Sequence, residues 1–417
     1  MKKLFRFDRA LFALLGILMV SAASAAEPDS AVPVFHFGGL SAYPGLGVVL
    51  KHDSNIFRVS DSSTSLIQKK TASTITVISP SVSVHTNKDI YAYSLDYIAS
   101  IGRYSNSSAD NYTDQSFLGY AEIGLSTRST LKITPEYLIG HDDRGAITSS
   151  AAFSATPVPS KWTSTRVSSS LAYGADEARG KALLEVGYNE QQYQNNRDTT
   201  KDYDKSLTNL GGTFYFRVQP KTWLLVNAKH TNISYKSGTF LSSLSNTLQP
   251  SLSGSEQRIM AGLKWEVTAQ SSGEVKLGQM QKNFDSATYA TNNSISWEGD
   301  VSWNPVGFVE VDFFTSKRPN ETALHGSRTI LVSTTGANVA YDLNDRVTLL
   351  ASAYHLNEDF VGVSRVDNTN NFGLKAEYKF RSWLVGEAEY TNSAKTSNAP
   401  QSDYKRNILM FGLRSVL

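Results

Sequence analysis

The sequence predicts an all-β fold, an antiparallel up-and-down transmembrane β-barrel of about 18 strands with short periplasmic turns and long extracellular loops. Three observations lead to this prediction. Short segments of alternating apolar and polar residues recur from Tyr43 to Leu417, their connections are alternately short and long, and no later segment is apolar enough for a transmembrane helix. Ser294–Trp303 shows the alternation best, with Glu298 and Asp300 on its polar face. Successive side chains of a strand face opposite sides of the sheet, so each segment has one apolar face and one polar face.

The first 26 residues are interpreted as a secretory signal peptide. Basic residues precede the apolar run Leu11–Val20, and the small residues Ser21–Ala26 include a cleavage site of the form Ala-x-Ala. An uncleaved anchor helix is the alternative, but spanning a bilayer takes about 20 apolar residues and this run is shorter. Residues 27–42 are predicted to form a periplasmic N-terminal segment, and residues 43–417 the barrel.

Composition excludes several classes of protein. The chain contains no cysteine, so it has neither a disulfide framework nor a thiolate metal site. Its 40 basic and 38 acidic residues give a net charge of +2, whereas a nucleic-acid-binding protein should be clearly basic. Tyrosine is abundant, with 20 residues, and there are 6 tryptophans; membrane interfaces favour both rings. We therefore expect contact with outer-membrane lipid and none with nucleic acid.

The alternation divides the barrel into eighteen predicted strands, each long enough to cross a bilayer when tilted. The first nine are Pro44–Phe57, Ser73–Thr86, Asp89–Gly102, Asn111–Ser126, Thr130–Gly140, Trp162–Tyr173, Ala182–Tyr193, Asp204–Val218 and Thr222–Lys236. The second nine are Ser255–Thr268, Gly273–Asn283, Asn293–Trp303, Gly307–Ser316, Arg328–Tyr341, Arg346–Asn357, Asn368–Lys379, Ser382–Asn392 and Asp403–Val416.

The connections indicate the orientation of these strands. Short turns such as Asn87-Lys88 and Phe380-Arg381 alternate with long polar loops such as His141–Lys161 and Ser237–Gly254. Bacterial outer-membrane barrels have short periplasmic turns, long external loops and an even number of strands. The sequence therefore predicts that both termini lie in the periplasm.

The charged faces of the strands are expected to line the barrel interior, because a charge at the lipid midplane costs about 2–4 kcal/mol. The predicted lumen residues are Glu185, Arg258, Lys264, Glu298, Glu310, Asp312, Lys375, Glu387 and Glu389, with Tyr120 and Tyr215 as aromatic candidates. The same alternation places Lys132, Arg217, Lys229, Lys276 and Arg406 inside. These charges either pair across strands and keep the lumen wet, or they form a conduit for a polar, sugar-rich substrate on which the tyrosines stack. A soluble sandwich or propeller would alternate too, but would not explain the rhythm of the turns.

The last strand carries a second mark of an outer-membrane barrel. Leu409, Phe411, Leu413 and Leu417 alternate up to the C-terminus. This series resembles the signal recognised by the barrel assembly machinery, which is therefore an expected partner. It departs from the usual form, because the last residue is leucine in place of phenylalanine and Ser415 interrupts the series.

The sequence does not favour an enzyme. No His or nucleophile motif with catalytic or metal-binding spacing is present, so neither a cofactor nor a metal is expected. The run His141-Asp142-Asp143-Arg144 opens a long loop, where solvated residues are expected; a surface enzyme or adhesin is the alternative. A plugged transporter is disfavoured because such barrels have about 22 strands and a plug domain before them.

The first strand carries a more distinctive motif, Tyr43-Pro44-Gly45-Leu46 followed by Asp53-Ser54-Asn55-Ile56-Phe57-Arg58. It resembles the first strand of the family described as "putative beta-barrel porin 2", with Asp53 and Asn55 at its polar positions and His52 where the family more often has tyrosine. From the residues themselves, the role expected of Asp53 and Asn55 is to end the strand and start the first external loop.

Members of that family are often encoded beside exopolysaccharide biosynthesis genes. The resemblance therefore implies an outer-membrane pore for export of a polysaccharide, above a periplasmic polysaccharide-export protein that docks beneath it. A general diffusion porin, often trimeric, is the competing hypothesis. In that case His141–Lys161 is the candidate constriction loop, although its acidic residues lie at its start.

Overall fold

The computed structural model describes residues 35–62, 69–86, 91–144, 156–175, 177–242, 247–268, 270–322, 324 and 326–416. The expected signal peptide, residues 1–26, and residues 27–34 of the expected N-terminal segment lie outside the described residues. Among the described residues, no helix has both the length and the apolar character needed to cross a membrane.

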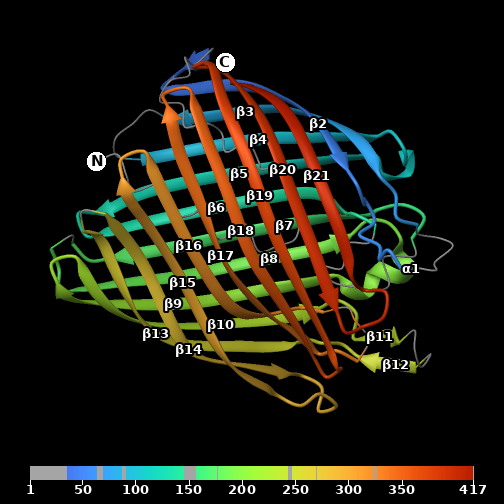
Figure 1. Cartoon of the computed structure of the whole chain (residues 1–417). Coiled ribbons are helices and arrows are strands. Elements are labelled where there is room, and N and C mark those ends of the chain that lie inside the picture. The colour runs from blue at the N-terminus through green and yellow to red at the C-terminus, as the bar shows by residue number, and fades with distance from the viewer. Residues whose placement is uncertain are drawn as a thin grey trace.

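The fold is a closed antiparallel β-barrel (Figure 1). One sheet of 19 strands includes a short strand, β1 (Phe35–Phe37), that pairs with β2 alone, so the barrel wall has the other 18 strands. The wall closes where β2 pairs with β21, from Gly45 opposite Val416 to Asp53 opposite Ile408. The predicted fold class and strand number are confirmed.

The wall strands follow one another in chain order. The first nine are β2 (Leu40–Asp53), β3 (Ser73–Thr86), β4 (Tyr91–Tyr104), β5 (Tyr112–Ser126), β6 (Ser129–Asp142), β7 (Ser160–Tyr173), β8 (Gly180–Tyr193), β9 (Lys205–Gln219) and β10 (Thr222–Tyr235). The second nine are β13 (Gly254–Thr268), β14 (Ser271–Phe284), β15 (Asn292–Val306), β16 (Val309–Asn320), β17 (Thr329–Asn344), β18 (Val347–Val361), β19 (Arg365–Arg381), β20 (Leu384–Ser397) and β21 (Tyr404–Val416).

Small elements decorate the two ends of the barrel. At the long-loop end lie a hairpin, β11 (Thr239–Ser242) and β12 (Thr247–Pro250), the helix α1 (Arg197–Thr200), and the 3-10 turns η2 (Ser108–Asp110) and η4 (Lys201–Tyr203). At the other end, β1 pairs with residues 40–42 of β2, beyond the point where β21 ends. The C-terminal strand and the first described residues lie at this short-turn end (Figure 1).

Two groups of strand boundaries differ from the prediction. The first strand was predicted to span Pro44–Phe57, but β2 starts at Leu40 and ends at Asp53. At the long-loop end several strands run further than predicted; β20, for example, ends at Ser397 and not at Asn392. The outward face is polar there, so the apolar–polar alternation used for prediction stops before the strand does.

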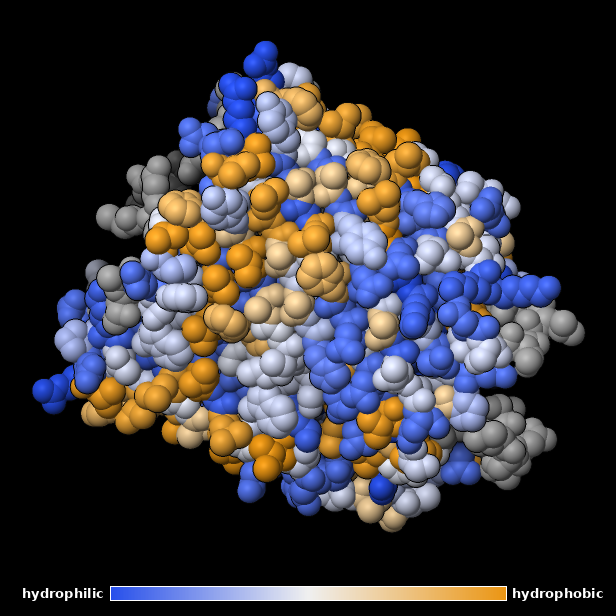
Figure 2. All heavy atoms as spheres, in the orientation of Figure 1, coloured by the Kyte–Doolittle hydropathy of each residue, from blue (hydrophilic) through white to orange (hydrophobic). Residues whose placement is uncertain are grey.

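The outer surface of the wall is apolar over the half nearer the termini. Outward side chains of β2 and β21, including Leu46, Val48, Phe411 and Leu413, are about half exposed. Figure 2 shows the hydrophobic residues gathered over this part of the wall and hydrophilic residues on the side of the long loops. This distribution is that of a lipid-facing band with strands that project beyond it into water.

Aromatic side chains border this band. Near the short turns, outward rings include Tyr91, Tyr173, Phe216, Trp303, Phe308, Phe380 and Trp383. Towards the long loops, a second set of outward rings includes Phe117, Tyr137, Tyr188, Phe372 and Tyr390. Two aromatic girdles flanking an apolar band are characteristic of barrels that span an outer membrane.

Candidate functional site: the lumen and its long-loop mouth

A ladder of charges runs across the lumen wall of β13, β14 and β15. Glu298 of β15 pairs with cations of the two preceding strands, with 2.7 Å between its Oε1 and Arg258 Nη1 of β13 and 2.9 Å between its Oε2 and Lys276 Nζ of β14. Lys276 also lies 3.1 Å from Glu274, and Arg258 lies 3.2 Å from Glu256. Each charge has a partner of opposite sign on the same face, so the wall is strongly polar without a large net field.

A second ladder lies on β19 and β20. Lys375 Nζ is 2.8 Å from a carboxylate oxygen of Glu377 and 2.8 Å from one of Glu387. Glu389, two residues further along β20, accepts a hydrogen bond of 3.1 Å from Thr391 Oγ1. Their outward neighbours on β19 are apolar and exposed, as the alternation predicts.

The remaining predicted residues also lie on the lumen face. The Tyr120 hydroxyl donates to Glu122, and the Ser302 hydroxyl donates to Asp312. Glu185 lies on the lumen face because its neighbours Leu184 and Val186 are exposed to the outside, and Glu310 does so because Phe313, three residues further along β16, is exposed there. Lys264 Nζ lies 5.4 Å from the centre of the Tyr215 ring.

Ion pairs across strands also occur on the wall formed by β5, β6 and β7. Lys132 Nζ lies 3.5 Å from Glu122, and Arg166 Nη1 lies 3.0 Å from Glu136. Both pairs join residues that face each other in the strand register. In these parts of the wall the lumen charges pair with one another across strands, which is the first of the two alternatives given for them.

The end of the first strand organises the mouth of the lumen at the long-loop end. The Asp53 side chain is fully buried, and Arg406 Nε donates to both of its carboxylate oxygens, at 3.1 and 3.0 Å. Asp53 also accepts a 3.0 Å hydrogen bond from the Asn55 backbone N–H. The Asn55 amide holds the next turn, because it donates to the Val59 carbonyl at 2.8 Å and accepts from the Val59 N–H at 3.0 Å.

The strand ends at Asp53, as expected, and the loop that starts there turns inward, a direction that the sequence did not predict. Ile56 and Phe57 are 5% and 9% exposed and pack on the wall residues Val49, Ile75 and Val77. Arg58 follows with a φ of 50°, a left-handed conformation that reverses the chain. The first loop therefore narrows the long-loop mouth of the lumen with apolar side chains.

A second segment clamps the first loop. Arg58 Nη2 lies 3.4 Å from Asp143 Oδ2, and the Arg144 guanidinium lies 4.8 Å from the centre of the Phe57 ring. Arg144 is itself held by Asp110 in η2, with 2.7 Å between Nε and Oδ1. The loop predicted as the constriction, His141–Lys161, contributes these residues at its start; residues 145–155 lie outside the described part of the chain.

His141 is held inside this clamp by two carboxylates. Its Nδ1 lies 2.9 Å from Asp114 and its Nε2 lies 3.3 Å from Asp143, while its ring stacks on Tyr112 at 4.3 Å. A histidine with both ring nitrogens held by carboxylates has no free lone pair for general-base catalysis. The geometry favours a clamp over the enzyme alternative.

The electrostatics of Asp143 follow from these contacts. Burial alone raises the pKa of its carboxyl, but the hydrogen bond from His141 and the charges of His141, Arg58 and Arg406 bring the pKa well below its usual range. Asp143 therefore stays ionised and keeps its hold on Arg58 throughout the physiological pH range.

The assembly of the mouth depends on contacts that the sequence pattern does not predict. Arg406 was assigned to the lumen, but its pairing with Asp53, 353 positions away, depends on closure of the barrel. The apolar pair Ile56 and Phe57 after the polar end of a strand was the one available signal that this loop folds inward.

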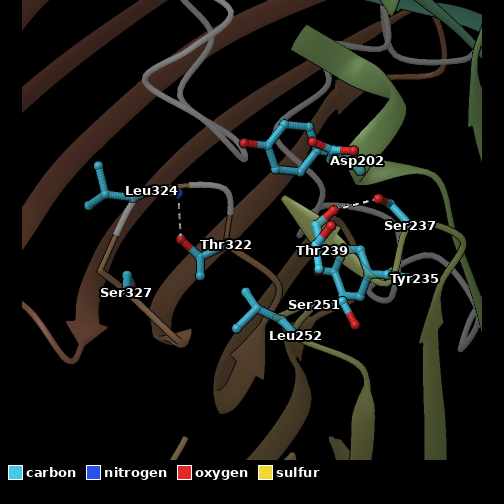
Figure 3. Close-up of a pocket in the computed structure, with 10 residues that line it drawn as sticks. Asp202, Tyr235, Ser237, Thr239, Ser251, Leu252, Thr322, Leu324 and Ser327 are labelled. Carbon is cyan, nitrogen blue, oxygen red and sulfur yellow. Dashed lines mark hydrogen bonds between the residues drawn. The ribbon is translucent and has the colours of Figure 1, made fainter. Parts of the chain in front are cut away.

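A small pocket lies at the same end, between the loops that follow β10 and β16. Tyr203 of η4, Tyr235 at the end of β10, and Leu252 and Leu324 contribute to its walls (Figure 3). The Tyr235 hydroxyl donates to Glu321 at 2.7 Å, so its oxygen is already engaged. The described residues include no group of three or more His, Asp or Glu side chains arranged to hold a metal ion.

The comparison with protein families agrees with this geometry. The model of the family described as "Putative beta-barrel porin 2" matches residues 35–416, which spans the whole wall from β1 to the end of β21. The chain belongs to this family. It is therefore a porin-like β-barrel of the outer membrane, and the predicted family is confirmed.

Solved structures with a related fold were found at low sequence identity. OpdK from Pseudomonas aeruginosa is 12% identical with a TM-score of 0.47, over 90% of this chain and 99% of that one. OpdL from the same organism is 10% identical with a TM-score of 0.48, over 91% and 99%. The FrpB iron transporter from Neisseria meningitidis is 13% identical with a TM-score of 0.44 over 86% of this chain, which spans 62% of FrpB. None of the curated proteins compared with the chain matches it.

Proposed function

We propose that this barrel is the outer-membrane conduit of an exopolysaccharide secretion system and performs no chemistry. The observation that carries the proposal is the lumen wall, on which charges such as Arg258, Glu298 and Lys276 are paired with one another. A wall of this kind is well hydrated, yet its mutual pairs offer few unpaired charges that would trap a passing chain. Such a surface lets a polymer move along the lumen without binding tightly at any one position.

The proposal includes the orientation of the barrel in the outer membrane. The short turns and both termini face the periplasm, and the first loop with its clamp faces the outside. A periplasmic polysaccharide-export protein docks beneath the short turns and delivers the polymer. The outward series Leu409, Phe411 and Leu413 of β21 engages the barrel assembly machinery during insertion.

Deletion of the gene tests the proposed export function directly. Surface polysaccharide should fall strongly in the deletion strain, while the polymer or its precursors accumulate inside the envelope. Complementation with the wild-type gene should restore the surface polymer. Normal amounts of surface polysaccharide in the deletion strain would refute the export function.

A diffusion porin for small hydrophilic solutes is the second candidate. It is favoured by the narrowed mouth, because Ile56 and Phe57 pack into the lumen where an inward loop would set the size limit. Stable trimers on gels, together with uptake of small sugars that depends on the barrel and unchanged surface polysaccharide, would support this alternative.

A further inference from the structure

The first described residues form a short hairpin at the short-turn end of the barrel. β1 pairs with residues 40–42 of β2 through the turn Gly38-Gly39. Both glycines have a positive φ, at 55° and 90°, which is the combination that a two-residue type I′ hairpin requires. The turn fixes the register, so Phe37 lies opposite Leu40 and Phe35 lies opposite Ala42.

This register places both phenylalanine rings on the outward side of the sheet. Along β2, Leu46 and Val48 are exposed on the outward face, whereas Val49 between that face and the lumen is buried on the inner side. The pairing of β2 with β3 is continuous, so residues 40 and 42 point in the same direction as Leu46. Directly opposite residues share one face of a sheet, so the two rings of β1 point outward as well.

The other face of the hairpin is polar and joins the lumen wall. His36 lies opposite Ser41, with 3.2 Å between His36 Nδ1 and Ser41 Oγ. Ser41 is fully buried, and Tyr43, the next residue on that face, is 7% exposed. The Tyr43 ring packs edge-on against His85 of β3, with 5.8 Å between the ring centres. The hairpin is therefore amphipathic, and its apolar face is turned away from the lumen.

The outward residues of β2 indicate how far the membrane reaches along this strand. From position 40 to position 50 every outward residue is apolar, and the next one, His52, is polar; the apolar series is Leu40, Ala42, Pro44, Leu46, Val48 and Leu50. This stretch of strand is about 33 Å long, or about 25 Å along the membrane normal at a tilt of about 40°. An outer-membrane barrel has an apolar band about 25 Å tall, so the band on β2 reaches as far as Leu40.

The two rings of β1 therefore lie at the edge of the apolar band. Phe35 is 64% exposed and Phe37 is 83% exposed, so contacts within the chain cover little of either ring. A two-stranded hairpin is at best marginally stable in water by itself, and this one has only three residue pairs. Membrane interfaces favour aromatic rings, and contact with lipid would bury the apolar face of the hairpin.

We infer that the β1 hairpin is an interfacial anchor, with Phe35 and Phe37 inserted into the lipid interface on the short-turn side of the membrane. The partner is the lipid surface, because the rings continue the lipid-facing side of β2 without a break. The anchor covers the edge of β2 that lies beyond the end of β21. The inference does not rest on the proposed export function, because the rings point outward whichever side of the membrane the short turns face.

Fluorescence quenching in vesicles tests the anchor. The chain contains no cysteine, so a single introduced cysteine carries an environment-sensitive fluorophore. Full-length F37C is labelled and reconstituted into phospholipid vesicles whose lipids carry a nitroxide either close to the headgroup or near the end of the acyl chain. The shallow nitroxide should quench the F37C label more strongly than the deep one. The emission should shift to shorter wavelength than in water, and quenching by aqueous iodide should be largely lost.

His36→Cys is the matched control, because residue 36 lies in the same strand but faces the other side. Its label should be quenched strongly by iodide and little by either nitroxide. Phe411→Cys, at the centre of the outward apolar series of β21, should respond most to the deep nitroxide, which verifies insertion into the bilayer. Heat-dependent migration on gels verifies that each variant is folded. Equal quenching of the F37C and H36C labels by the lipid nitroxides would overturn the inference.

The same measurement separates lipid from a protein partner. If the rings were a docking surface for another protein, the F37C label would be open to iodide in vesicles that contain the barrel alone. That result would refute the interfacial anchor.

Hydrogen exchange provides a second measurement that needs no label. In vesicles, residues 35–42 should exchange faster in F35S/F37S than in wild type, because the hairpin keeps its glycine turn but loses its lipid contact. Phe372→Ser changes an outward ring on β19 and should leave exchange of residues 35–42 at the wild-type rate. Unchanged exchange in F35S/F37S would show that lipid contact does not hold the hairpin.

Discussion

The Asp53 carboxylate, at the end of the first wall strand, accepts hydrogen bonds from both Nε and Nη2 of Arg406 in the last wall strand. Both side chains are buried, at 0% and 5% exposure. The contact joins the two strands that close the barrel and fixes the point at which the chain leaves the wall and enters the mouth. One ion pair therefore connects barrel closure to the position of the first loop.

Asp53→Ala should destabilise the barrel by about 3–5 kcal/mol, because it leaves the Arg406 charge buried without a partner. Urea titration of the protein folded in lipid vesicles measures this free energy of unfolding. Replacing both residues, as in D53A/R406M, should cost less than Asp53→Ala alone. Asp61→Ala is the control, since Asp61 forms an exposed pair with Lys70, and it should have no measurable effect. Equal stability of Asp53→Ala and wild type would contradict the assigned role.

Phe57→Ala should widen the long-loop mouth of the lumen, because the Phe57 ring packs against the lumen wall and the Arg144 guanidinium lies over it. The expected result is a larger single-channel conductance in planar bilayers and faster uptake of sugars into vesicles. Phe372→Ala is matched in chemistry but lies on the outward face, 44% exposed, and should leave conductance unchanged. Unaltered conductance and uptake in Phe57→Ala would exclude the first loop as the constriction.

The clamp between the loops should weaken in acid. The pKa of Asp143 is lowered in the folded protein by the hydrogen bond and charges that outweigh its burial. Its stabilising contribution is therefore complete above the unfolded value, about 3.9, and is lost as pH falls through the lower folded value. Hydrogen exchange of residues 56–60 should speed up below about pH 4. Asp143→Asn should show fast exchange already at neutral pH and little further change; an equal acid response in both proteins would contradict this role.

Glu298→Gln should make the pore more selective for anions. Glu298 neutralises both Arg258 and Lys276, so its removal leaves two lumen cations with a smaller opposing charge. The reversal potential across a bilayer with a salt gradient should move towards that of the anion. Asp345→Asn removes an exposed charge from a short turn and should shift it much less. A shift of equal size in the two variants would show that Glu298 does not face the conduction path.

Individual residues show which features of the fold could be predicted from the sequence. The alternation around Glu298 and Lys375 was sufficient to place both inside the barrel, because a strand has a period of two and lipid excludes charge. The boundaries at the long-loop end were less accurate, as at Ser397, where the outward face of the strand is polar and the alternation ends. The apolar–polar alternation arises where one face of a strand contacts lipid, so it gives no signal in the part of the strand that extends beyond the lipid.

The sequence by itself determined that the chain forms an 18-stranded barrel with an apolar outside and a charged inside. It also determined the family, through the motif in the first strand. These features follow from the two-residue period of a strand and the cost of polar groups in lipid, which act on each strand separately. The tertiary structure alone decided that Asp53 meets Arg406, that the first loop turns inward, and that Asp143 holds Arg58. Such contacts depend on barrel closure and on the register between strands, which bring together side chains that are distant in the sequence.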